Sequence, residues 1–559
     1  MHAPDFPLEE RTIGRVLAEK ARRIPDRALL RWQGTVYSYA QAESLSNRYA
    51  NGFSALGVRH GDHVAVMMPN CPEFLWVVWG LGKIGAVAVP LNTAAKGDML
   101  AYFVDQSDSR WMVFDAQWSD RVTTIAARVP KVETFLVHGP GDGPREADSA
   151  FGPVAPDVAG DRGAPCVVGA RAAIPLDTVA VDDDTAPPVD RVAHDDTHLI
   201  MYTSGTTGPS KGVMCPHSQG LGVGRSLTID YGYRPDDVLY TCLPLFHANA
   251  LWYSVAAALW ADASVALSPR FSASAFWDEI LASGATQFNS LGAMTNIVMQ
   301  LPEGPHERAH RLRQCMVVPM QKDLYAAIRR RFGVEPTSLF AMTENYAVTS
   351  FLPGDRPDKA GSAGSGRGLS ALRIVDDDGT VLPAGEVGEI QVRPLQPGSM
   401  MKGYYRMPEA TANAFVDGWF CTGDRGRLDA DGYLYFVDRK KEAIRRRGEN
   451  ISAYEVELIL SGHPGILEAA AVAVPSELSE DEVMVYLVRR PGAEVSCEEV
   501  IRFADARMSH FMVPRFVEFV DALPKTSTEK IEKYKLKQDA VARRDTLWDR
   551  EKAGIRLAR

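Results

Sequence analysis

The segment Tyr202–Gly212, which reads YTSGTTGPSKG, has the residue types that bind phosphate groups. Positions 203–207 carry four hydroxyl side chains and one glycine, and two later glycines allow the backbone amides to face one point. Hydroxyls, amides and Lys211 together can surround the oxygens of a polyphosphate. The spacing differs from the P-loop pattern GxxxxGK[ST], which would need glycine at Ser210 and a hydroxyl residue at Gly212. The segment therefore predicts a polyphosphate site that is not a P-loop.

Four further segments place charged or hydroxyl residues beside glycines or turns. They are FAMTE at 340–344, WFCTGDRG at 419–426, DRKKEAIRRRGENISAYEVE at 438–457 and PKTSTEKIEKYKL at 524–536. Taken singly, each has an ordinary interpretation as a helix start, a turn aspartate or a solvated charged surface. Their ordered occurrence along one chain with the phosphate-binding segment is far more specific than any one of them.

With these motifs in this order, residues 12–536 resemble the adenylate-forming superfamily of acyl-CoA synthetases, nonribosomal adenylation domains and luciferases. The hinge and C-terminal motifs look most like those of carnitine and crotonobetaine-CoA ligases. The resemblance implies an α/β fold, in which a large N-terminal domain of layered α/β subdomains carries a small β-barrel-like subdomain. It also implies a mobile, small α+β C-terminal domain.

The resemblance implies that several motif residues hold the nucleotide. By the family's pattern, Phe340 stacks on adenine, Thr343 holds the α-phosphate and Asp424 binds the ribose hydroxyls. Glu344 is the predicted ligand of Mg²⁺, a hard cation that prefers carboxylate oxygen. The predicted nucleotide-binding residues are Thr203, Ser204, Gly205, Thr206, Thr207, Gly208, Lys211, Val318, Leu339, Phe340, Ala341, Met342, Thr343, Asp424 and Arg439.

The same resemblance assigns catalysis and domain movement. Lys530 matches the adenylation lysine, which would stabilise charge that builds up between the carboxylate and the α-phosphate. His247, in LPLFHANAL, would orient the acyl group, and because amino-acid-activating relatives typically carry aspartate here, it argues against an amino-acid substrate. Lys441 matches the pivot of the small domain. The predicted catalytic residues are Lys530, Glu344, Thr343 and His247. The predicted CoA-binding residues are Arg447, Gly448 and Glu449.

Some positions depart from the family pattern. Larger side chains replace small residues at Met316, Val317 and Val318 before Pro319, and at Leu339 and Ala341 around Phe340. These side chains would reshape the adenine and acyl pocket. Glu529 replaces a glycine and places an anion beside Lys530. The departures raise the hypothesis that adenylation is impaired and that the enzyme mainly converts a supplied acyl-adenylate to its CoA ester.

The composition indicates a globular protein with small-molecule partners. The net charge of -10 argues against nucleic-acid binding, which needs a basic face. The seven cysteines are scattered without a CxxC pair, which favours reduced thiols in the cytoplasm over a zinc site or disulfides. The N-terminus lacks a secretory pattern, and the most apolar segment, 74–91, contains Lys83 and several glycines, so no transmembrane span is expected.

Changes in composition along the chain of 559 residues predict its domains, since this length exceeds that of one core. Residues 1–438 are predicted to form the AMP-binding N-terminal domain, with a β-rich subdomain over about 361–438. Residues 439–441 would be the hinge and 442–559 the mobile C-terminal domain. Residues 139–195 are rich in Gly, Pro and Asp and are predicted to form a long surface excursion.

These features predict an acid–thiol ligase that converts a carboxylic acid to its acyl-CoA thioester through an acyl-adenylate, using ATP, Mg²⁺ and CoA. A homodimer is compatible with the sequence. Three rivals stay open besides impaired adenylation: loading of a carrier-protein thiol, luciferase-like oxygenation, and nucleotide binding without turnover. Retention of Lys211, Glu344, Asp424 and Lys530 argues against the last. The sequence does not identify the acid.

Overall fold

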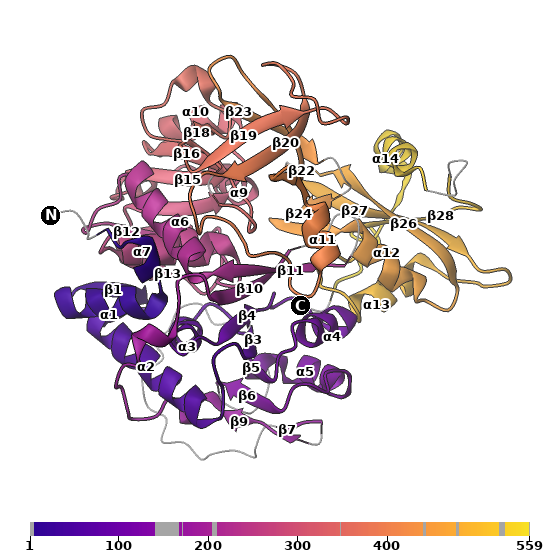
Figure 1. Ribbon diagram of the computed structural model, residues 1–559. Helices are drawn as coiled ribbons and strands as arrows, with labels where there is room; N and C mark the ends of the chain where they lie inside the picture. The colour runs from indigo at the N-terminus through magenta and orange to yellow at the C-terminus, as the bar shows by residue number, and fades with distance from the viewer. Residues whose placement is uncertain are drawn as a thin grey trace.

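The computed structural model describes residues 5–139, 167–169, 171–203, 209–346, 348–439, 443–476, 480–524 and 531–557. Figure 1 shows a large body formed by most of the chain and a smaller lobe, from β24 onward, at its side. Helices and strands alternate through the body, and both parts contain sheets covered by helices. This two-part α/β architecture confirms the predicted fold class. Part of the predicted surface excursion, residues 140–166, lies outside the described residues.

A seven-stranded sheet organises the first part of the chain. Its central strands are short apolar runs such as HVAVM and VAVP, which suit a sheet that is buried on both faces. In spatial order the strands are β11 (Lys211–Pro216), β10 (Thr197–Thr203), β4 (Val87–Pro90), β3 (His63–Met67), β5 (Trp111–Asp115), β6 (Thr134–His138) and β9 (Ile174–Pro175). Strands β4 to β9 run parallel, whereas β10 and β11 form an antiparallel hairpin that encloses the predicted phosphate-binding segment.

Helices cover both faces of this sheet. Because successive strand residues point to opposite faces, Val64 and Val66 of β3 pack in the main core, whereas Ala65 and Met67 pack in a second core. The main core contains α1 (Ile13–Arg23), α2 (Tyr39–Ala55) and α3 (Pro72–Lys83). The second core contains α4 (Gly97–Gln106) and α5 (Ser119–Ile125).

A nine-stranded sheet lies on the other side of the main core. Its strands, in spatial order, are β18 (Ser365–Gly366), β17 (Thr349–Phe351), β16 (Glu335–Phe340), β15 (Gln314–Val318), β14 (Gln287–Leu291), β12 (Val238–Thr241), β13 (Ser264–Leu267), β1 (Ala28–Trp32) and β2 (Thr35–Ser38). The helices of this stretch are α6 (His217–Asp230), the π-helical η6 (Asn249–Ala256), α7 (Ala257–Trp260), α8 (Phe276–Ser283), α9 (Gly292–Gln300) and α10 (Lys322–Arg331).

A five-stranded antiparallel sheet falls within the range predicted for the β-rich subdomain. It contains β19 (Ser370–Val375), β20 (Gly388–Pro394), β21 (Phe415–Val416), β22 (Trp419–Leu428) and β23 (Leu434–Arg439), and α11 (Pro408–Asn413) precedes β21. A separate short hairpin is formed by β7 (Val167–Val168) and β8 (Arg171–Ala172). The five-stranded sheet carries the predicted ribose-binding Asp424 on β22.

The C-terminal lobe has its own hydrophobic packing. Its elements are β24 (Ala443–Arg446), β25 (Glu449–Ser452), α12 (Ala453–Ser461), β26 (Ile466–Pro475), β27 (Asp481–Arg489), α13 (Cys497–Asp505), β28 (Phe516–Phe519), α14 (Lys533–Ala542) and β29 (Trp548–Asp549). Ala469 and Ala471 of β26 face the core shared with α12 and α13, whereas Ala470 and Val472 face the core shared with α14. None of the described helices has both the length and the apolar character required to span a bilayer.

Candidate active site

A large cavity lies where the carboxyl ends of strands from both large sheets meet the C-terminal lobe. Its volume is about 1830 Å³, and its walls include residues at or just after the ends of β3, β4, β12, β14, β15 and β16. Ligands of α/β sheets characteristically bind at this edge. Of the predicted site residues, those that line the cavity are Thr203, Lys211, His247, Val318, Leu339, Ala341, Met342, Thr343, Glu344, Asp424, Arg447, Gly448 and Glu449.

Other predicted site residues lie elsewhere or outside the described chain. Residues 204–208, Lys441 and Lys530 are outside the described residues. Phe340 is 8% exposed, packs in the main core and is not among the residues that line the cavity. Its stacking on adenine stays a prediction. Arg439 ends β23, where its backbone pairs with that of Asp424.

The positions that depart from the family pattern divide into two groups. Val318, Leu339 and Ala341 line the cavity, as expected for residues that would reshape it. Met316 and Val317 are buried in the main core instead, because β15 is a central strand that is covered on both faces. Only the first group can therefore contact a bound nucleotide or acyl group directly in this arrangement.

A polar group surrounds Glu344 at the end of the cavity next to the phosphate-binding segment. The hydroxyl of Tyr404 donates to Oε1 of Glu344 at 3.0 Å, and Thr203 Oγ1 lies 3.5 Å from the same oxygen. Burial and the Glu344 charge raise the pKa of Tyr404, so its hydroxyl stays a donor. The ammonium of Lys211 lies 4.6 Å from the centre of the Tyr404 ring, within range of a cation–π contact.

The oxygen-rich surroundings of Glu344 fit a magnesium ion. A carboxylate and a hydroxyl are the hard oxygen donors that this cation prefers, and Glu344 and Thr203 bring both to one point. Backbone bonds hold the loop in place: Gln219 Nε2 donates to the Thr343 carbonyl at 2.8 Å, and Met401 N donates to the Glu344 carbonyl at 2.8 Å. These two hydrogen bonds hold the backbone from which the side chain of Glu344 reaches the cavity wall.

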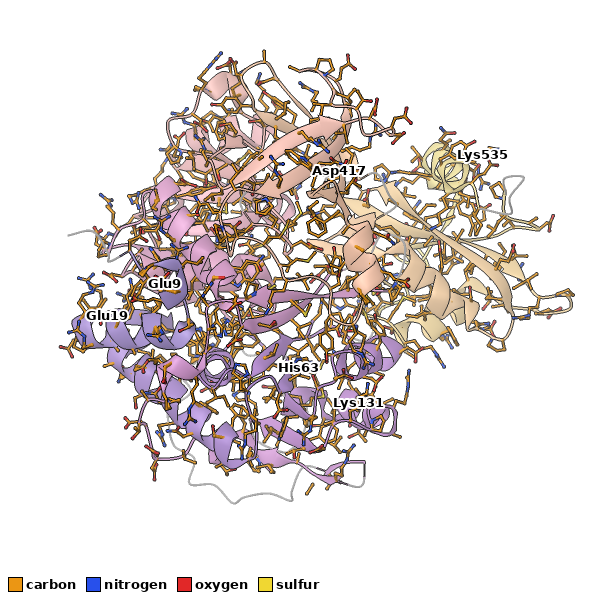
Figure 2. The ribbon with its side chains drawn as sticks, viewed as in Figure 1. Glu9, Glu19, His63, Lys131, Asp417 and Lys535 are labelled. Carbon is orange, nitrogen blue, oxygen red and sulfur yellow. The ribbon has the colours of Figure 1, made fainter. Side chains whose placement is uncertain are left out.

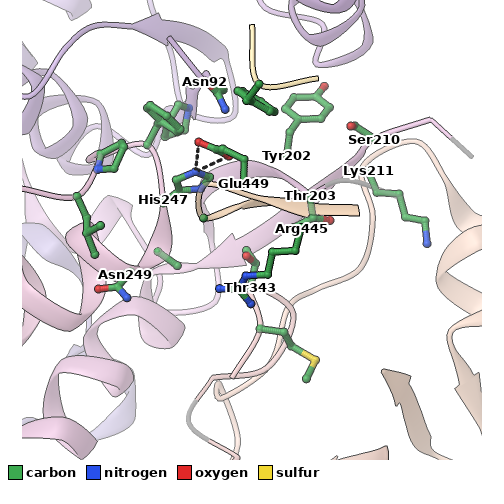
Figure 3. A pocket seen from close by; sticks show the side chains of 18 of the residues that line it. Asn92, Tyr202, Thr203, Ser210, Lys211, His247, Asn249, Thr343, Arg445 and Glu449 are labelled. Atoms are coloured by element: carbon green, nitrogen blue, oxygen red, sulfur yellow. Dashed lines mark hydrogen bonds and ion pairs between the residues drawn. The ribbon is translucent and has the colours of Figure 1, made fainter. Parts of the chain in front are cut away.

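His247 forms a polar contact with the C-terminal lobe across the cavity. Its Nε2 lies 3.2 Å from Oε2 of Glu449. Figure 3 marks this contact with dashed lines and also labels Thr203 and Lys211, which lie on the adjacent strands β10 and β11. Burial opposes the charged imidazole, but the charge and hydrogen bond of Glu449 outweigh burial and raise the pKa of His247. Burial likewise opposes ionisation of Glu449, yet His247 and a hydrogen bond from Asn92 lower its pKa. The two groups form an ion pair.

Gly448, beside this pair, allows a close approach of the hairpin formed by β24 and β25. Its φ of 81° lies in the left-handed region, which favours glycine. A Cβ atom at this position would lie 2.1 Å from Cδ1 of Leu291. A larger residue at position 448 would have to adopt a strained backbone and displace the side chain of Leu291.

A second polar contact joins the phosphate-binding segment to the C-terminal lobe. Glu455, in the first turn of α12, accepts hydrogen bonds from the backbone N–H of Ser210 at 2.8 Å and from its hydroxyl at 2.5 Å. The hydroxyl of Tyr102 donates to the Ser210 carbonyl at 2.8 Å. Burial raises the pKa of Glu455, although both bonds from Ser210 favour its charged form. A carboxylate thus binds the end of a segment predicted to bind phosphate.

Tyr404 and Glu455 were not among the residues predicted from the sequence. Tyr404 reaches Glu344 because an isolated bridge pairs it with Val213 of β11, which no local pattern indicates. Glu455 stands three residues after Ser452, a spacing that indicates a helix cap. This spacing could have identified the start of α12, but it carries no sign of the contact with Ser210.

Among its described residues, the C-terminal lobe presents the segment around Gly448 to the cavity. The C-terminal residues that line it are Arg445, Arg446, Arg447, Gly448, Glu449, Glu455, Ser476, Glu480, Asp481, Glu482 and Phe511. Pro524 and Ile531, which flank the segment containing Lys530, are not among them. The helix that follows, α14, lies at the outer side of the lobe, where Figure 2 labels its Lys535. The segment with Gly448 therefore faces the cavity in this arrangement.

Comparisons with known proteins agree with this architecture. The AMP-binding enzyme family model matches residues 17–405, and the model of the AMP-binding enzyme C-terminal domain matches residues 455–530. A crotonobetaine/carnitine–CoA ligase from Salmonella choleraesuis is 34% identical to the chain over 521 residues, which cover 90% of this chain and 93% of that ligase.

Solved structures extend the match to the whole fold. A double mutant of o-succinylbenzoate CoA synthetase from Bacillus subtilis, bound with its product analogue, has a TM-score of 0.79 at 25% identity; the match covers 94% of this chain and 98% of that one. ATP-bound MatB from Rhodopseudomonas palustris has a TM-score of 0.65 at 28% identity, with 95% and 99% covered. The predicted resemblance to acyl-CoA synthetases is confirmed.

Proposed function

Because the chain belongs to the AMP-binding enzyme family and is an AMP-forming acid–CoA ligase, we propose that both of its half-reactions take place in the cavity beneath the C-terminal lobe. The observation that carries this proposal is the meeting of Thr203, Lys211, Glu344 and Asp424 with the Gly448 hairpin around one space. The first four match nucleotide-binding motifs, and the hairpin matches a CoA-binding motif. Enclosure suits a reaction whose acyl-adenylate hydrolyses in water.

In the first half-reaction, the substrate carboxylate attacks the α-phosphorus of ATP and pyrophosphate leaves. Thr203 and Lys211 stand at the two ends of the phosphate-binding segment, and we assign them, with residues 204–208, to the phosphates. Glu344 would hold Mg²⁺, which when bound neutralises charge on the leaving pyrophosphate. We assign to Lys530 the stabilisation of charge at the α-phosphorus after the C-terminal lobe turns.

In the second half-reaction, the thiolate of CoA attacks the acyl carbon and AMP leaves. The described arrangement supports this step, because the Gly448 hairpin packs against Leu291 and the His247–Glu449 pair holds it there. Because Gly448 has no side chain, the hairpin can approach β14 closely, and this glycine matches the family's glycine beside the pantetheine channel. We therefore assign this arrangement to thioester formation.

Apolar and aromatic residues of the same cavity are suited to the acyl chain. They include Phe246, Tyr253, Phe271, Leu291, Met294 and Ile297. Aromatic faces accept a quaternary ammonium group as well as an apolar one, so both small zwitterionic acids and bulkier apolar acids fit this wall. The crotonobetaine/carnitine–CoA ligase relative supports testing the first class, and the apolar lining supports testing the second.

The side chains of Val318, Leu339 and Ala341 in the cavity wall favour a second candidate, a ligase whose adenylation step is weak. Such an enzyme would mainly convert a supplied acyl-adenylate to its CoA ester. Exchange of labelled pyrophosphate into ATP, in the presence of the preferred acid, separates the two candidates. Rapid exchange excludes weak adenylation, whereas fast thioester formation from a preformed adenylate without exchange supports it.

The principal test is a panel of carboxylic acids, including carnitine, crotonobetaine, aromatic and branched-chain acids, supplied with ATP, Mg²⁺ and CoA. We expect at least one acid to give acyl-CoA and AMP in equal amounts, with pyrophosphate as the other product. Formation of ADP, or AMP release that does not depend on CoA, would contradict the proposal. Transfer of the acyl group to a carrier protein but not to CoA would favour the rival function of loading a carrier-protein thiol.

A further inference from the structure

Outside the cavity, three side chains that commonly bind metals meet in the body of the molecule. Oxygen, nitrogen and sulfur atoms of Glu73, His138 and Cys71 all lie within 4.8 Å of one another. None of the three lines the cavity described above. Their separation in the sequence hides the group, because no two of them are spaced as a short metal-binding motif.

The three residues lie at the carboxyl edge of the seven-stranded sheet, beside the ends of β3 and β6. Cys71 is the N-cap residue of α3, just after β3, and Glu73 follows in the first turn of that helix. His138 ends β6, and Asp115 ends β5, which lies between β3 and β6. The chain leaves β3 for β4 on one side and later returns to β5 on the other, so its connections diverge at β3 and β5. Such a switch point at the carboxyl edge is where α/β sheets bind ligands.

Asp115 orients the imidazole of His138 as the partner of a metal-bound histidine does. Its Oδ2 lies 2.7 Å from Nδ1 of His138, which directs Nε2 toward Glu73, whose Oε2 is 3.8 Å away. In protein metal sites, a carboxylate commonly accepts the Nδ1–H and leaves Nε2 to the ion. The contact between Asp115 and His138 is therefore a second feature of a metal site, in addition to the three candidate ligands.

Burial and charge around the group favour a cation. Cys71 is 6% exposed, and the side chains of Asp115 and Glu73 are 14% and 37% exposed, so Glu73 lies on the solvent side. The carboxylates of Asp115 and Glu73 both face the imidazole of His138. A divalent cation would satisfy the same negative surroundings.

We propose that Cys71 Sγ, His138 Nε2 and a Glu73 carboxylate oxygen bind one divalent transition-metal ion of the zinc class. Thiolate, imidazole and carboxylate together suit zinc or cobalt, whereas magnesium prefers oxygen ligands alone. Binding replaces two protons, one from the Cys71 thiol and one from His138 Nε2, and both pass to solvent. A water molecule completes four-coordination.

The proposed ion would connect the loop after β3 to the end of β6. Asn70, next to Cys71, donates through Nδ2 to the carbonyls of Leu243 and Ser268 at 2.9 and 3.0 Å, which joins this loop to the nine-stranded sheet. The ion would therefore rigidify the junction between the two sheets. This inference does not depend on the proposed function of the cavity.

The test uses the full-length protein freed of metal by chelation and titrated with Co²⁺ in the absence of nucleotide. We expect one equivalent to bind with a thiolate-to-cobalt absorption band, and Zn²⁺ to displace it. Cys71→Ser should abolish the band. Glu73→Gln and Asp115→Asn should each weaken binding by about tenfold or more. Because Glu73 is the most exposed of the group, its substitution tests the site even if the Cys71 variant fails to fold.

Matched controls separate this site from adventitious binding. Cys497→Ser removes a free cysteine in the C-terminal lobe, and His60→Asn removes a histidine that pairs with Asp196 at 2.9 Å. Both should retain the band and the cobalt affinity of the wild type. Binding that is unchanged in the Glu73 and Asp115 variants, or a wild-type protein that shows no thiolate band, would overturn the proposal.

Discussion

Two stretches of the C-terminal lobe share one local pattern. Residues 448–455 read GENISAYE and residues 492–499 read GAEVSCEE, so each has a glycine, a serine four positions later and a glutamate three positions after that. The glycines have similar positive φ values, 81° and 76°. Each serine caps a helix of nine residues, α12 or α13, by accepting the N–H of its glutamate.

The two glutamates nevertheless have different partners. Glu499 returns to the N–H of its own cap, Ser496, at 2.8 Å, and this hydrogen bond lowers its pKa. Glu455 instead reaches Ser210 in the body of the molecule, and burial raises its pKa. The local pattern therefore begins a helix in both places, but tertiary contacts convert one copy into part of the candidate active site.

The two glycines also have different surroundings, and their substitution gives the largest expected effect on the rate. Alanine at either position meets the left-handed strain, which costs about 1–2 kcal/mol of stability. Gly492 has open space around it, but a Cβ at Gly448 would lie 2.1 Å from Leu291. We therefore expect Gly448→Ala to slow thioester formation from a preformed acyl-adenylate by about 100-fold, whereas Gly492→Ala leaves this rate unchanged. Single-turnover measurements with CoA compare the two.

A compensating change sharpens this prediction. Leu291→Ala removes the atom that a Cβ at position 448 would meet, so the double variant with Gly448→Ala should recover part of the lost rate. If the double variant is as slow as Gly448→Ala alone, the loss comes from backbone strain and not from contact with Leu291.

The glutamates predict the next largest effect. Glu455→Ala removes the acceptor of both hydrogen bonds from Ser210 and should lower the rate of thioester formation by about tenfold, since a hydrogen bond to a charged group contributes about 1.5 kcal/mol or more. Glu499→Ala should leave the rate unchanged. Equal rates for the two variants in the single-turnover assay would show that Glu455 does not contribute to the second half-reaction.

The cap serine of α13 predicts a loss of stability without a loss of catalysis. Ser496→Ala removes the side chain that accepts from Glu499 N at 3.2 Å and should cost about 1 kcal/mol of the free energy of unfolding. Denaturant unfolding measures this loss, and the steady-state rate should match that of the wild type. A reduced rate would mean that α13, like α12, contributes to the cavity.

The smallest effect is a difference in pH dependence. The folded-state pKa of Glu455 is raised, so the wild type loses stability relative to Glu455→Gln as pH rises above the ordinary carboxyl value of about 4.3. The folded-state pKa of Glu499 is lowered, so the wild type is more stable than Glu499→Gln at neutral pH and loses this advantage as pH falls through that lowered pKa. Denaturant unfolding from about pH 2 to about pH 8 covers both windows and checks both signs.

Several candidate site residues that the sequence indicated belong to local motifs, and these residues lie together in the structure. Thr203 and Lys211 were expected at the ends of a glycine-rich loop, and they stand opposite each other on β10 and β11. Thr343, Glu344 and Asp424 line one cavity with them, as their motif order indicated. Motifs of this kind carry residue types whose spacing is set by the local backbone, so one sequence is sufficient to recognise them.

The sequence could not predict contacts that depend on side-chain direction or on distant segments. Leu339 and Phe340 are neighbours that both pack in the main core, yet of the two Leu339 alone also lines the cavity. Ser210 and Glu455 lie far apart in the sequence, one in the body of the molecule and the other in the C-terminal lobe. Only the packed fold brings such groups together, because no local pattern distinguishes Glu455 from Glu499.

The central claim is that a carboxylate attacks the α-phosphorus of ATP in this cavity. The most direct measurement supplies the preferred acid with heavy oxygen in its carboxylate, together with ATP, Mg²⁺ and CoA, and determines the mass of the products. The account predicts that the released AMP carries one heavy oxygen, because the acyl–oxygen bond of the adenylate breaks when the thiolate attacks. AMP without the label, or label in inorganic phosphate or pyrophosphate, would contradict it.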